Sequence, residues 1–382
     1  MISLEDIPLG LYIHLPWCIR KCPYCDFNSH EKSGELPFDR YVDCLIADLN
    51  RQLPSVNERT VSSIFIGGGT PSLFPAAAIR QLMDRIRSSV SCATNMEVTL
   101  EANPGAADAA RFAGYLDAGV NRLSIGVQSF RDRQLKLLGR VHSANDARDA
   151  YLAARNAGFS NINIDIMHGL PEDDVEENLS DLRSALDLQP EHISWYQLTV
   201  ESGTAFARKP PQLPSHDDVA EQFDQGRALL ESAGFRQYEI SAYATSNSEA
   251  RHNINYWEFG DYLGIGAGAH GKLTTETGIY RSENRRGPAS YMAQAGLQAC
   301  SVMVGPIEEG SLVGEFAINA LRLRGGYRET LFSERTGLCA SLIEKPLATA
   351  TERGWLTRER GIVQPTELGF LFLSDVQLLF LN

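Results

Sequence analysis

The sequence has few positively charged residues for its size and no long apolar run. Its 35 Lys and Arg residues are outnumbered by 48 Asp and Glu residues, which gives a formal net charge of −13. Such an acidic chain does not suit general binding to the phosphate backbone of nucleic acid, which needs a basic surface. No apolar stretch approaches the roughly 20 residues of a membrane helix, and no basic segment followed by an apolar run opens the chain. We therefore expect a cytoplasmic protein that binds no nucleic acid and associates at most transiently with a membrane.

Cysteine is also scarce, which makes its clustering informative. The chain has 7 cysteines. Those without ligand spacing are interpreted as small core residues: Cys44, Cys92, Cys300 and Cys339. The others, Cys18, Cys22 and Cys25, form a C-x3-C-x2-C motif directly after the apolar run Leu11–Leu15. Asp26 and Phe27 follow, so no fourth cysteine comes at once.

Three thiolates on one short loop are suited to an iron–sulfur cluster. Cysteine thiolates are the usual ligands of [4Fe–4S] clusters, although the common ferredoxin spacings differ from this one. Three ligands would leave one iron open to a small molecule. One alternative is a zinc site with a fourth ligand from His14 or His30, since structural zinc normally takes four protein ligands. The other is that the three cysteines are ordinary core thiols. Disulfides are disfavoured in a cytoplasmic protein.

Short β-rich runs alternate with longer helical patterns from Leu11 to Leu198. The pattern predicts strands at 11–14, 63–66, 96–100, 122–125, 161–167 and 192–198, and helices at 38–52, 75–87, 106–118, 132–138, 145–157 and 175–188. Such alternation implies a parallel sheet with helices outside it. The predicted fold class is α/β, a partial (β/α)6 TIM-like barrel of about six units with a smaller, mainly helical C-terminal domain.

The pattern changes beyond Glu201. Three prolines mark a connection at Lys209–Pro214, after which the sequence predicts a helix at 217–233, a strand at 237–243 and a glycine-rich stretch at 260–271. We predict three parts. Residues 1–205 form the partial barrel, 206–304 form a barrel extension and connecting segment, and 305–382 form a small C-terminal accessory domain.

Most of the distinctive motifs follow a predicted strand. In barrel folds the chemistry lies at these carboxyl ends. Gly67, Gly68 and Gly69 let the backbone approach a ligand closely, although a tight turn alone would also use glycine. Glu101 and Asp165 suit ammonium groups or ribose hydroxyls, whereas Gln128 and Arg140 suit a carboxylate. Taken together, these residues describe a polar pocket for a zwitterion that carries a sugar.

The cysteine motif, with Tyr24 before its last cysteine, resembles that of the radical S-adenosylmethionine (SAM) superfamily. A wider set resembles the oxygen-independent coproporphyrinogen III oxidase family: GGGTPS at 67–72, EANP at 101–104, RLSIGVQSF at 122–130, DIMHGLP at 165–171 and YQLTVESGTAF at 196–206. The resemblance runs from about Leu11 to the C-terminus. It implies a [4Fe–4S] cluster on Cys18, Cys22 and Cys25, with SAM on the open iron.

The same resemblance implies residues for SAM. Tyr12, Gly68 and Glu101 match positions that line the first SAM site. Positions that hold a second SAM in the oxidase branch are matched by Tyr24, Gly69, Thr70, Gln128, Arg140 and Asp165. The oxidase branch carries a further cysteine just after the three ligands and a longer N-terminal segment. This sequence has neither feature, so a second SAM is not implied with equal force.

The stretch His252–Trp257 resembles the HNxxYW signature of the haem-chaperone (HemW) branch of this family. A neutral imidazole is a good axial ligand of haem iron, and His252 is the residue we predict for it. The local sequence alone favours a buried, hydrogen-bonded histidine, and only the resemblance favours haem contact.

The resemblance to this branch implies a protein that binds haem and passes it to a haem-requiring membrane or respiratory protein, with an electron donor such as flavodoxin or ferredoxin. The rival interpretation is an oxidase that decarboxylates coproporphyrinogen III. A radical SAM enzyme acting on another substrate is a third.

Overall fold

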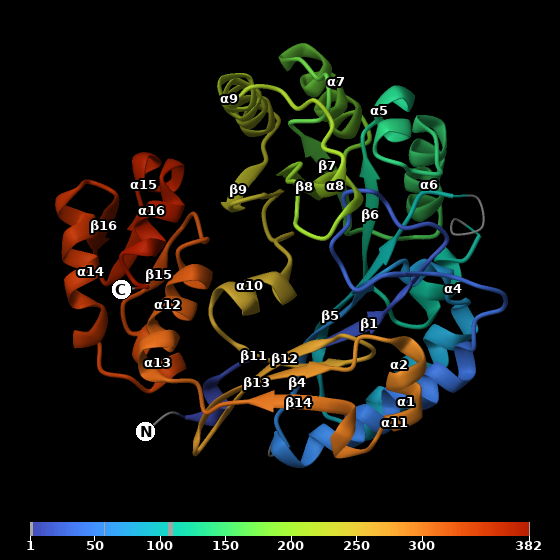
Figure 1. Ribbon diagram of the computed structural model, residues 1–382, viewed down its shortest axis with the longest axis horizontal. Helices are drawn as coiled ribbons and strands as arrows, with labels where there is room; N and C mark the ends of the chain where they lie inside the picture. Colours follow the sequence, from blue (N-terminus) through green and yellow to red (C-terminus); the bar gives the residue numbers. More distant parts are fainter. Residues whose placement is uncertain (1–2, 57, 106–109, 382) are drawn as a thin grey trace.

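A mixed sheet of 12 strands runs through the molecule (Figure 1). The computed structural model describes residues 3–56, 58–105 and 110–381. The central strands are parallel and follow the order of the chain. They are β1 (Leu9–Leu15), β4 (Val61–Gly68), β5 (Cys92–Ala102), β6 (Arg122–Gln128), β7 (Ile162–His168) and β8 (His192–Gln197). The predicted α/β fold with a parallel sheet is therefore confirmed.

Amphipathic helices cover the outer face of this arc of strands (Figure 1). They are α1 (Phe38–Gln52), α2 (Ala76–Ser89), α4 (Phe112–Asp117), α5 (Asp132–Leu137), α6 (Ala144–Asn156), α7 (Val175–Leu186) and α9 (His216–Ser232). In α1 the buried residues Tyr41, Leu45 and Leu49 pack into the core of the sheet, as the period of the sequence predicts. Part of the helix predicted at 106–118 lies outside the described residues.

Local signals in the sequence set several helix starts. Ser143 accepts a hydrogen bond from the Asp146 amide and forms a capping box at the start of α6. Asp174 caps α7 by accepting from the Glu177 amide. The shorter pieces are β2 (Trp17–Cys18), β3 (His30–Glu31), α8 (Ala205–Arg208) and single 3-10 turns at Leu4–Asp6, Leu53–Ser55, Pro71–Leu73 and Gln298–Cys300.

The sheet is extended at both edges of the arc. The single strand predicted at 237–243 is wrong, because the chain reverses there into β9 (Arg236–Glu239) and β10 (Ala242–Ala244), which pair antiparallel. At the other edge β11 (Asp261–Ile265) pairs parallel with β1. It is followed by the antiparallel strands β12 (His270–Thr275), β13 (Gly278–Asn284) and β14 (Ser301–Val304). The helices of this region are α10 (Arg251–Trp257) and α11 (Pro288–Gln294).

The C-terminal residues form a second packed unit on the open side of the arc (Figure 1). Its helices are α12 (Glu309–Ala320), α13 (Leu331–Thr336), α14 (Ser341–Glu352), α15 (Glu367–Leu371) and α16 (Leu373–Leu378). A small antiparallel sheet joins β15 (Tyr327–Arg328), β17 (Ile362–Pro365) and β16 (Leu356–Glu359). Phe316, Phe332 and Leu347 form its core together with Phe259 and Ile279 from the preceding segment. The two boundaries between the three parts predicted from sequence stay predictions.

No helix among the described residues has both the length and the apolar character needed to cross a membrane.

Candidate cofactor and ligand site

A cavity of about 400 Å³ lies inside the arc of strands. Along β6 every second residue lines it, namely Arg122, Ser124, Gly126 and Gln128, and the residues between them are buried in the apolar core. This period of two follows from the pleat of a strand. The cavity therefore extends from the carboxyl end of β6 to its first residue. At about 3.3 Å per residue, these two ends are roughly 20 Å apart.

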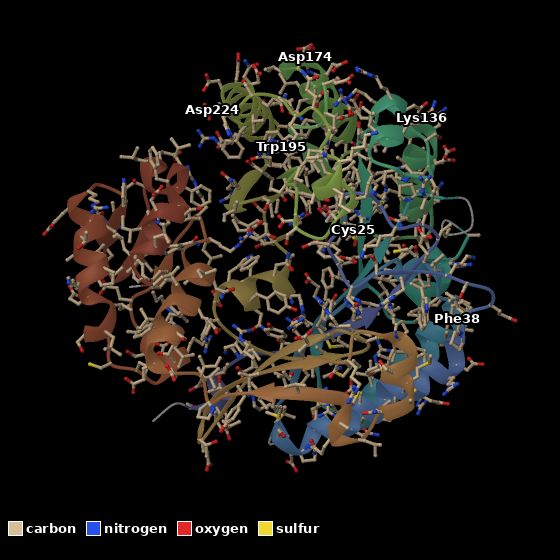
Figure 2. All side chains as sticks on the ribbon, in the orientation of Figure 1. Cys25, Phe38, Lys136, Asp174, Trp195 and Asp224 are labelled. Atoms are coloured by element: carbon tan, nitrogen blue, oxygen red, sulfur yellow. The ribbon has the colours of Figure 1, made fainter. Side chains whose placement is uncertain are left out.

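The cysteine loop closes one end of the cavity, and all three predicted ligands line it. Cys18 ends β2, and a turn from the Cys22 carbonyl to the Cys25 amide, 3.1 Å long, brings the other two together. Figure 2 labels Cys25 near the middle of the molecule. Each sulfur has a different polar neighbour: Thr70 Oγ1 lies 3.5 Å from Cys18, Arg140 Nη1 lies 3.7 Å from Cys22 and Ser29 Oγ lies 3.7 Å from Cys25.

This donor set fits a cluster held by three thiolates. Hydroxyl and guanidinium donors next to the sulfurs favour the thiolate form and stabilise charge on a cluster. For Cys18, burial raises the pKa of the thiol and the hydrogen bond from Thr70 opposes that rise. Within the described residues no three His, Cys, Asp or Glu side chains are gathered closely enough to hold a single metal ion.

The glycines after β4 pack directly against the cysteine loop. Gly68 has a φ of +119°, and a Cβ placed on it would lie 2.7 Å from the His14 ring. A Cβ on Gly69 would lie 2.6 Å from the Trp17 carbonyl oxygen. Real Cβ atoms do not approach other atoms so closely, so this turn requires glycine. Both glycines and Thr70 also line the cavity. These glycines therefore allow the backbone to approach both the cysteine loop and a ligand in the cavity.

Two half-buried carboxyl groups, Glu101 and Asp165, stand in the middle of the cavity wall. Burial raises the pKa of Glu101 to about 8, with a further rise from Asp165, against the hydrogen bond that the Gly68 amide donates to it at 3.1 Å. Burial also raises the pKa of Asp165, although hydrogen bonds from Asn163 at 2.7 Å and from Ser124 at 3.1 Å favour its charged form. Glu101 is therefore mainly protonated near neutral pH and can donate as well as accept.

Gln128 and Arg140 lie at the cysteine end. Gln128 is buried with a φ of +71° and accepts a hydrogen bond of 2.7 Å from the Tyr196 hydroxyl. Arg140 donates to the Gly126 carbonyl at 2.6 Å and to Asn103 Oδ1 at 2.7 Å. Tyr24 lines the cavity beside them. A buried non-glycine residue at positive φ is strained and persists only where its surroundings hold it.

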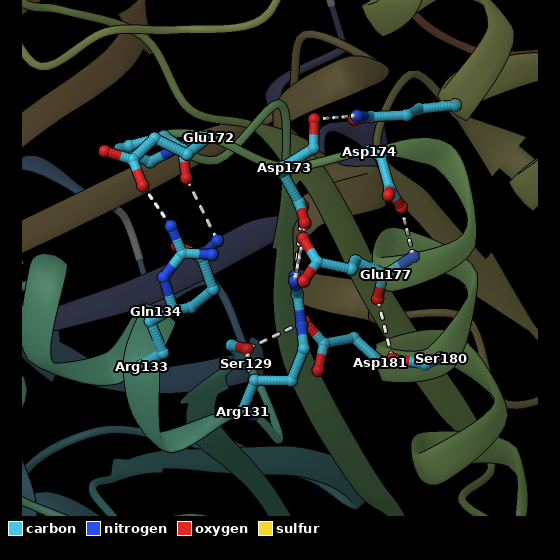
Figure 3. A network of polar contacts seen from close by, with 12 residues as sticks. Ser129, Arg131, Arg133, Gln134, Glu172, Asp173, Asp174, Glu177, Ser180 and Asp181 are labelled. Atoms are coloured by element: carbon cyan, nitrogen blue, oxygen red, sulfur yellow. Dashed lines mark hydrogen bonds and ion pairs between the residues drawn. The ribbon is translucent and has the colours of Figure 1, made fainter.

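An ion-pair network holds the backbone that follows Gln128 (Figure 3). Asp181 of α7 accepts from Ser129 Oγ and from the Phe130 amide, both at 2.7 Å. Arg131 binds Asp181 at 2.9 Å and Asp173 at 2.5 Å, and both carboxylates are fully buried. The network fixes the turn after β6 and therefore the direction in which Gln128 points.

Two predicted residues lie outside the cavity lining that the structure describes. The Tyr12 hydroxyl hydrogen-bonds to His14 Nδ1 at 2.9 Å, and its ring stacks on Phe65, which does line the cavity. His252 is 1% exposed, and its two ring nitrogens hydrogen-bond to Ser63 Oγ at 2.9 Å and Tyr256 Oη at 2.8 Å. An iron bond at His252 would require one of these hydrogen bonds to break, so its role as a haem ligand stays a prediction.

The sequence reasoning missed several residues that line the same cavity. They are Arg122, Ser124, Asn163, Ser194 and Tyr196 on the strands, with Asn253 and Arg322 from later segments. Alternation within β6 was a usable signal for Arg122 and Ser124, because both are in phase with Gln128. No local signal places Arg322, which follows α12, next to the barrel.

Known proteins were then compared with the chain. The sequence profile of the Radical SAM superfamily matches residues 12–182. The heme chaperone HemW of Escherichia coli is 47% identical over 375 residues, covering 98% of both chains. The chain belongs to the HemW family within the radical SAM superfamily.

Other members of the HemW family agree. The heme chaperone HemW of Haemophilus influenzae is 46% identical over 380 residues and 98% of each chain. That of Bacillus subtilis is 33% identical over 375 residues, covering 96% of this chain and 97% of its own. Among solved structures, the coproporphyrinogen III oxidase HemN of Escherichia coli superposes with a TM-score of 0.82, covering 98% of this chain and 90% of HemN. At 23% identity, that likeness shows the fold alone.

Proposed function

We propose that this protein is a haem chaperone that binds haem and transfers it to a haem-requiring respiratory protein. The observation that carries the proposal is similarity over nearly the whole chain to proteins named heme chaperone HemW. The oxidase alternative rests on likeness to HemN, which at 23% identity extends no further than the fold. We therefore favour the chaperone.

The proposed cofactors are a [4Fe–4S] cluster and SAM. Cys18, Cys22 and Cys25 would hold the cluster, and the proposed first SAM site comprises Tyr12, Gly68 and Glu101. When bound, the cluster and SAM would together supply one-electron reductive chemistry at the sulfonium, and the protein would supply binding and orientation. Thr70 and Arg140 donate toward the sulfurs of Cys18 and Cys22. A protonated Glu101 would offer SAM a hydrogen-bond donor, and an electron donor such as flavodoxin or ferredoxin would serve the cluster.

We further propose His252 as the haem ligand. Burial lowers the pKa of His252 to about 3, so the imidazole is neutral at physiological pH, which is the form that binds iron. The ring is held by Ser63 and Tyr256. A haem would therefore have to displace one of these two hydroxyls.

Anaerobic titration of the reconstituted protein with haem tests the proposal. We expect a shift of the haem Soret band that saturates at one haem per chain, and its loss in His252→Ala. The Tyr256→Phe variant removes only the hydroxyl that occupies Nε2, so it should bind haem at least as well as the wild type. His216→Ala, on the exposed surface of α9, controls for binding to any surface imidazole.

The same sample, given SAM, a reductant and coproporphyrinogen III, separates the chaperone from the oxidase. We expect no porphyrin product. Turnover to protoporphyrinogen together with an unchanged haem spectrum would overturn the chaperone proposal. SAM cleavage without either activity would point to another substrate.

A further inference from the structure

A buried arginine without a counter-ion lies at the end of the cavity opposite the cysteines. Arg122 is 2% exposed and lines the cavity. Its Nε has no hydrogen-bond partner, and no ion pair or side-chain hydrogen bond links its guanidinium to another described residue. A guanidinium removed from water without a partner is costly to the folded state. Such a group is retained where a ligand supplies the missing anion.

The neighbouring carboxyl groups do not fill this role. Asp165 is near enough for Arg122 to oppose the rise of its pKa, but its oxygens accept from Asn163 and Ser124 instead. Glu239 binds Arg322 at 3.0 Å and accepts from the Ser241 amide at 3.0 Å. The charge of Arg122 is therefore available to a group inside the cavity.

Further unused donors lie at the same cavity. The Arg322 guanidinium lies 4.1 Å from the centre of the Trp257 ring. The buried Nε of Arg322 and the indole Nε1 of Trp257 have no hydrogen-bond partner. Asn253, next to His252, lines the cavity with them. Guanidinium and indole N–H groups are donors only, so they call for an acceptor, and a carboxylate is the acceptor that a guanidinium fork matches.

We infer that Arg122, assisted by Arg322, binds a propionate carboxylate of the tetrapyrrole cargo; this rests on the proposed function. The carboxylate of SAM does not suit the position, because its amino-acid group would sit at the cluster, roughly 20 Å away along β6. A tetrapyrrole joins an apolar ring to carboxylates at one edge. The stacked Trp257 and Arg322 offer an aromatic face and a cation for these two parts. Arg322 is already paired with Glu239, so Arg122 should contribute more.

Haem and haem dimethyl ester, which lacks free carboxylates, test the inference on the full-length protein. We expect the wild type to bind haem at least ~10-fold more tightly than the ester, as losing a charged hydrogen-bond partner does. Arg122→Met should bind both compounds with one affinity, close to that of the wild type for the ester. Arg122→Lys keeps the charge and should keep part of the preference for haem.

A stability measurement separates this role from a structural one. Arg122→Met removes a buried, unpaired charge, so its melting temperature without ligand should equal or exceed that of the wild type. Arg59→Met is the matched control: Arg59 is 8% exposed but pairs with Asp261 at 2.8 Å and is not part of the described cavity lining. It should melt lower than the wild type and keep the preference for haem.

Two results would overturn the inference alone. One is wild-type protein that binds haem and its dimethyl ester equally; the other is Arg122→Met that keeps the preference for haem. Wild-type protein that binds neither compound would overturn the proposed function and this inference together, so the two failures are distinguishable.

Discussion

Burial shifts the pKa of the titratable residues that line the cavity more than neighbouring charges do. Glu101 illustrates this, because burial is the largest cause of its raised pKa and the charge of Asp165 is the second. With Glu101 protonated, the cavity lining carries four arginines, Arg20, Arg122, Arg140 and Arg322, against the carboxyl groups of Asp165 and Glu239. An acidic protein thus presents a basic interior, which is suited to an anionic ligand.

Replacing Glu101 by Gln should stabilise the protein above mildly acidic pH. The folded pKa is about 8 and the ordinary value is 4.5. Between these values the unfolded chain releases a proton that the folded protein retains, so wild-type stability falls as pH rises, by at most about 1.4 kcal/mol per pH unit. Glu101→Gln does not titrate, and its oxygen can still accept from Gly68. Denaturant unfolding should show no gain near pH 4 and a growing gain up to about pH 8. A constant difference across this range would contradict the assignment.

Replacing any one of Cys18, Cys22 or Cys25 by Ala should lower bound iron and labile sulfide severalfold after anaerobic reconstitution. Two remaining thiolates would leave a second iron of the cluster without a protein ligand. Cys339→Ser is the matched control, because Cys339 is exposed and distant from the motif in sequence. Elemental analysis and visible absorption measure the outcome. Equal loss in Cys339→Ser would show that the motif is not the ligand set.

The sequence predicts the cysteine end of the site better than the opposite end. Cys18, Gly68 and Gln128 stand in motifs whose residue types show a role. Arg122 stands at the start of a strand, where an arginine normally reaches solvent, so its position gives no local signal of burial. It is buried because the strands curve around the cavity. For His252 the sequence motif could be identified, but its hydrogen bonds to Ser63 and Tyr256 could not be predicted from the sequence.

Among the structural elements, the turn after β6 depends on one arginine. Arg131 balances Asp173 and Asp181, both fully buried, and burial raises the pKa of Asp173 to about 6 in spite of this pairing. Two residues further on, Arg133 pairs with Glu172 on the exposed surface. The ion pairs of Arg131 and the ion pair of Arg133 (Figure 3) therefore differ mainly in burial.

Arg131→Gln should lower the free energy of unfolding by about 3–5 kcal/mol, because it leaves buried carboxylates without a counter-charge. Arg133→Gln, the matched control, should change it by no more than about 1 kcal/mol, as exposed pairs do. Urea unfolding at neutral pH measures both. If both substitutions lowered the free energy of unfolding equally, burial would not be the reason that Arg131 matters more than Arg133.

The central strands and helices were predictable, whereas the edges of the sheet were not. The strands β4 to β8 are buried apolar runs between helices, a pattern that depends on local sequence. The reversal between β9 and β10 has no glycine or asparagine to mark it. Instead, Gln237 donates to the Ile240 carbonyl at 2.9 Å. β11 and β12 lie in a glycine-rich stretch whose sequence resembles a loop. One of these glycines, Gly264, is needed because it packs against the backbone of His270.

At the scale of the whole molecule, the core of the sheet and the core of the C-terminal unit both include residues from the segment between them. Phe259 precedes β11 but is fully buried in the C-terminal core. Lys272 Nζ lies 4.3 Å from the centre of its ring and donates to the Phe259 carbonyl at 3.0 Å. The C-terminal unit is thereby joined to the sheet by apolar contact as well as by the Arg322–Glu239 pair.

Phe259→Ala should destabilise the C-terminal unit by about 3–5 kcal/mol, the usual cost of a large cavity in a core. Amide hydrogen exchange should accelerate across 305–381 and change little in β4 and β5. Leu371→Ala, at a side chain 70% exposed, should stay within about 0.5 kcal/mol of the wild type. Uniform acceleration over the whole chain would mean that the two cores unfold as one unit.

The inner face of the strands is polar, while the apolar layer lies between their outer face and the helices. The side chains that would determine ligand selectivity and those that stabilise the fold therefore lie on opposite faces of the same strands. A wall position such as Ser194 can be exchanged without repacking the layer beneath the helices. The fold can therefore accommodate a different ligand when single side chains that line the cavity are changed.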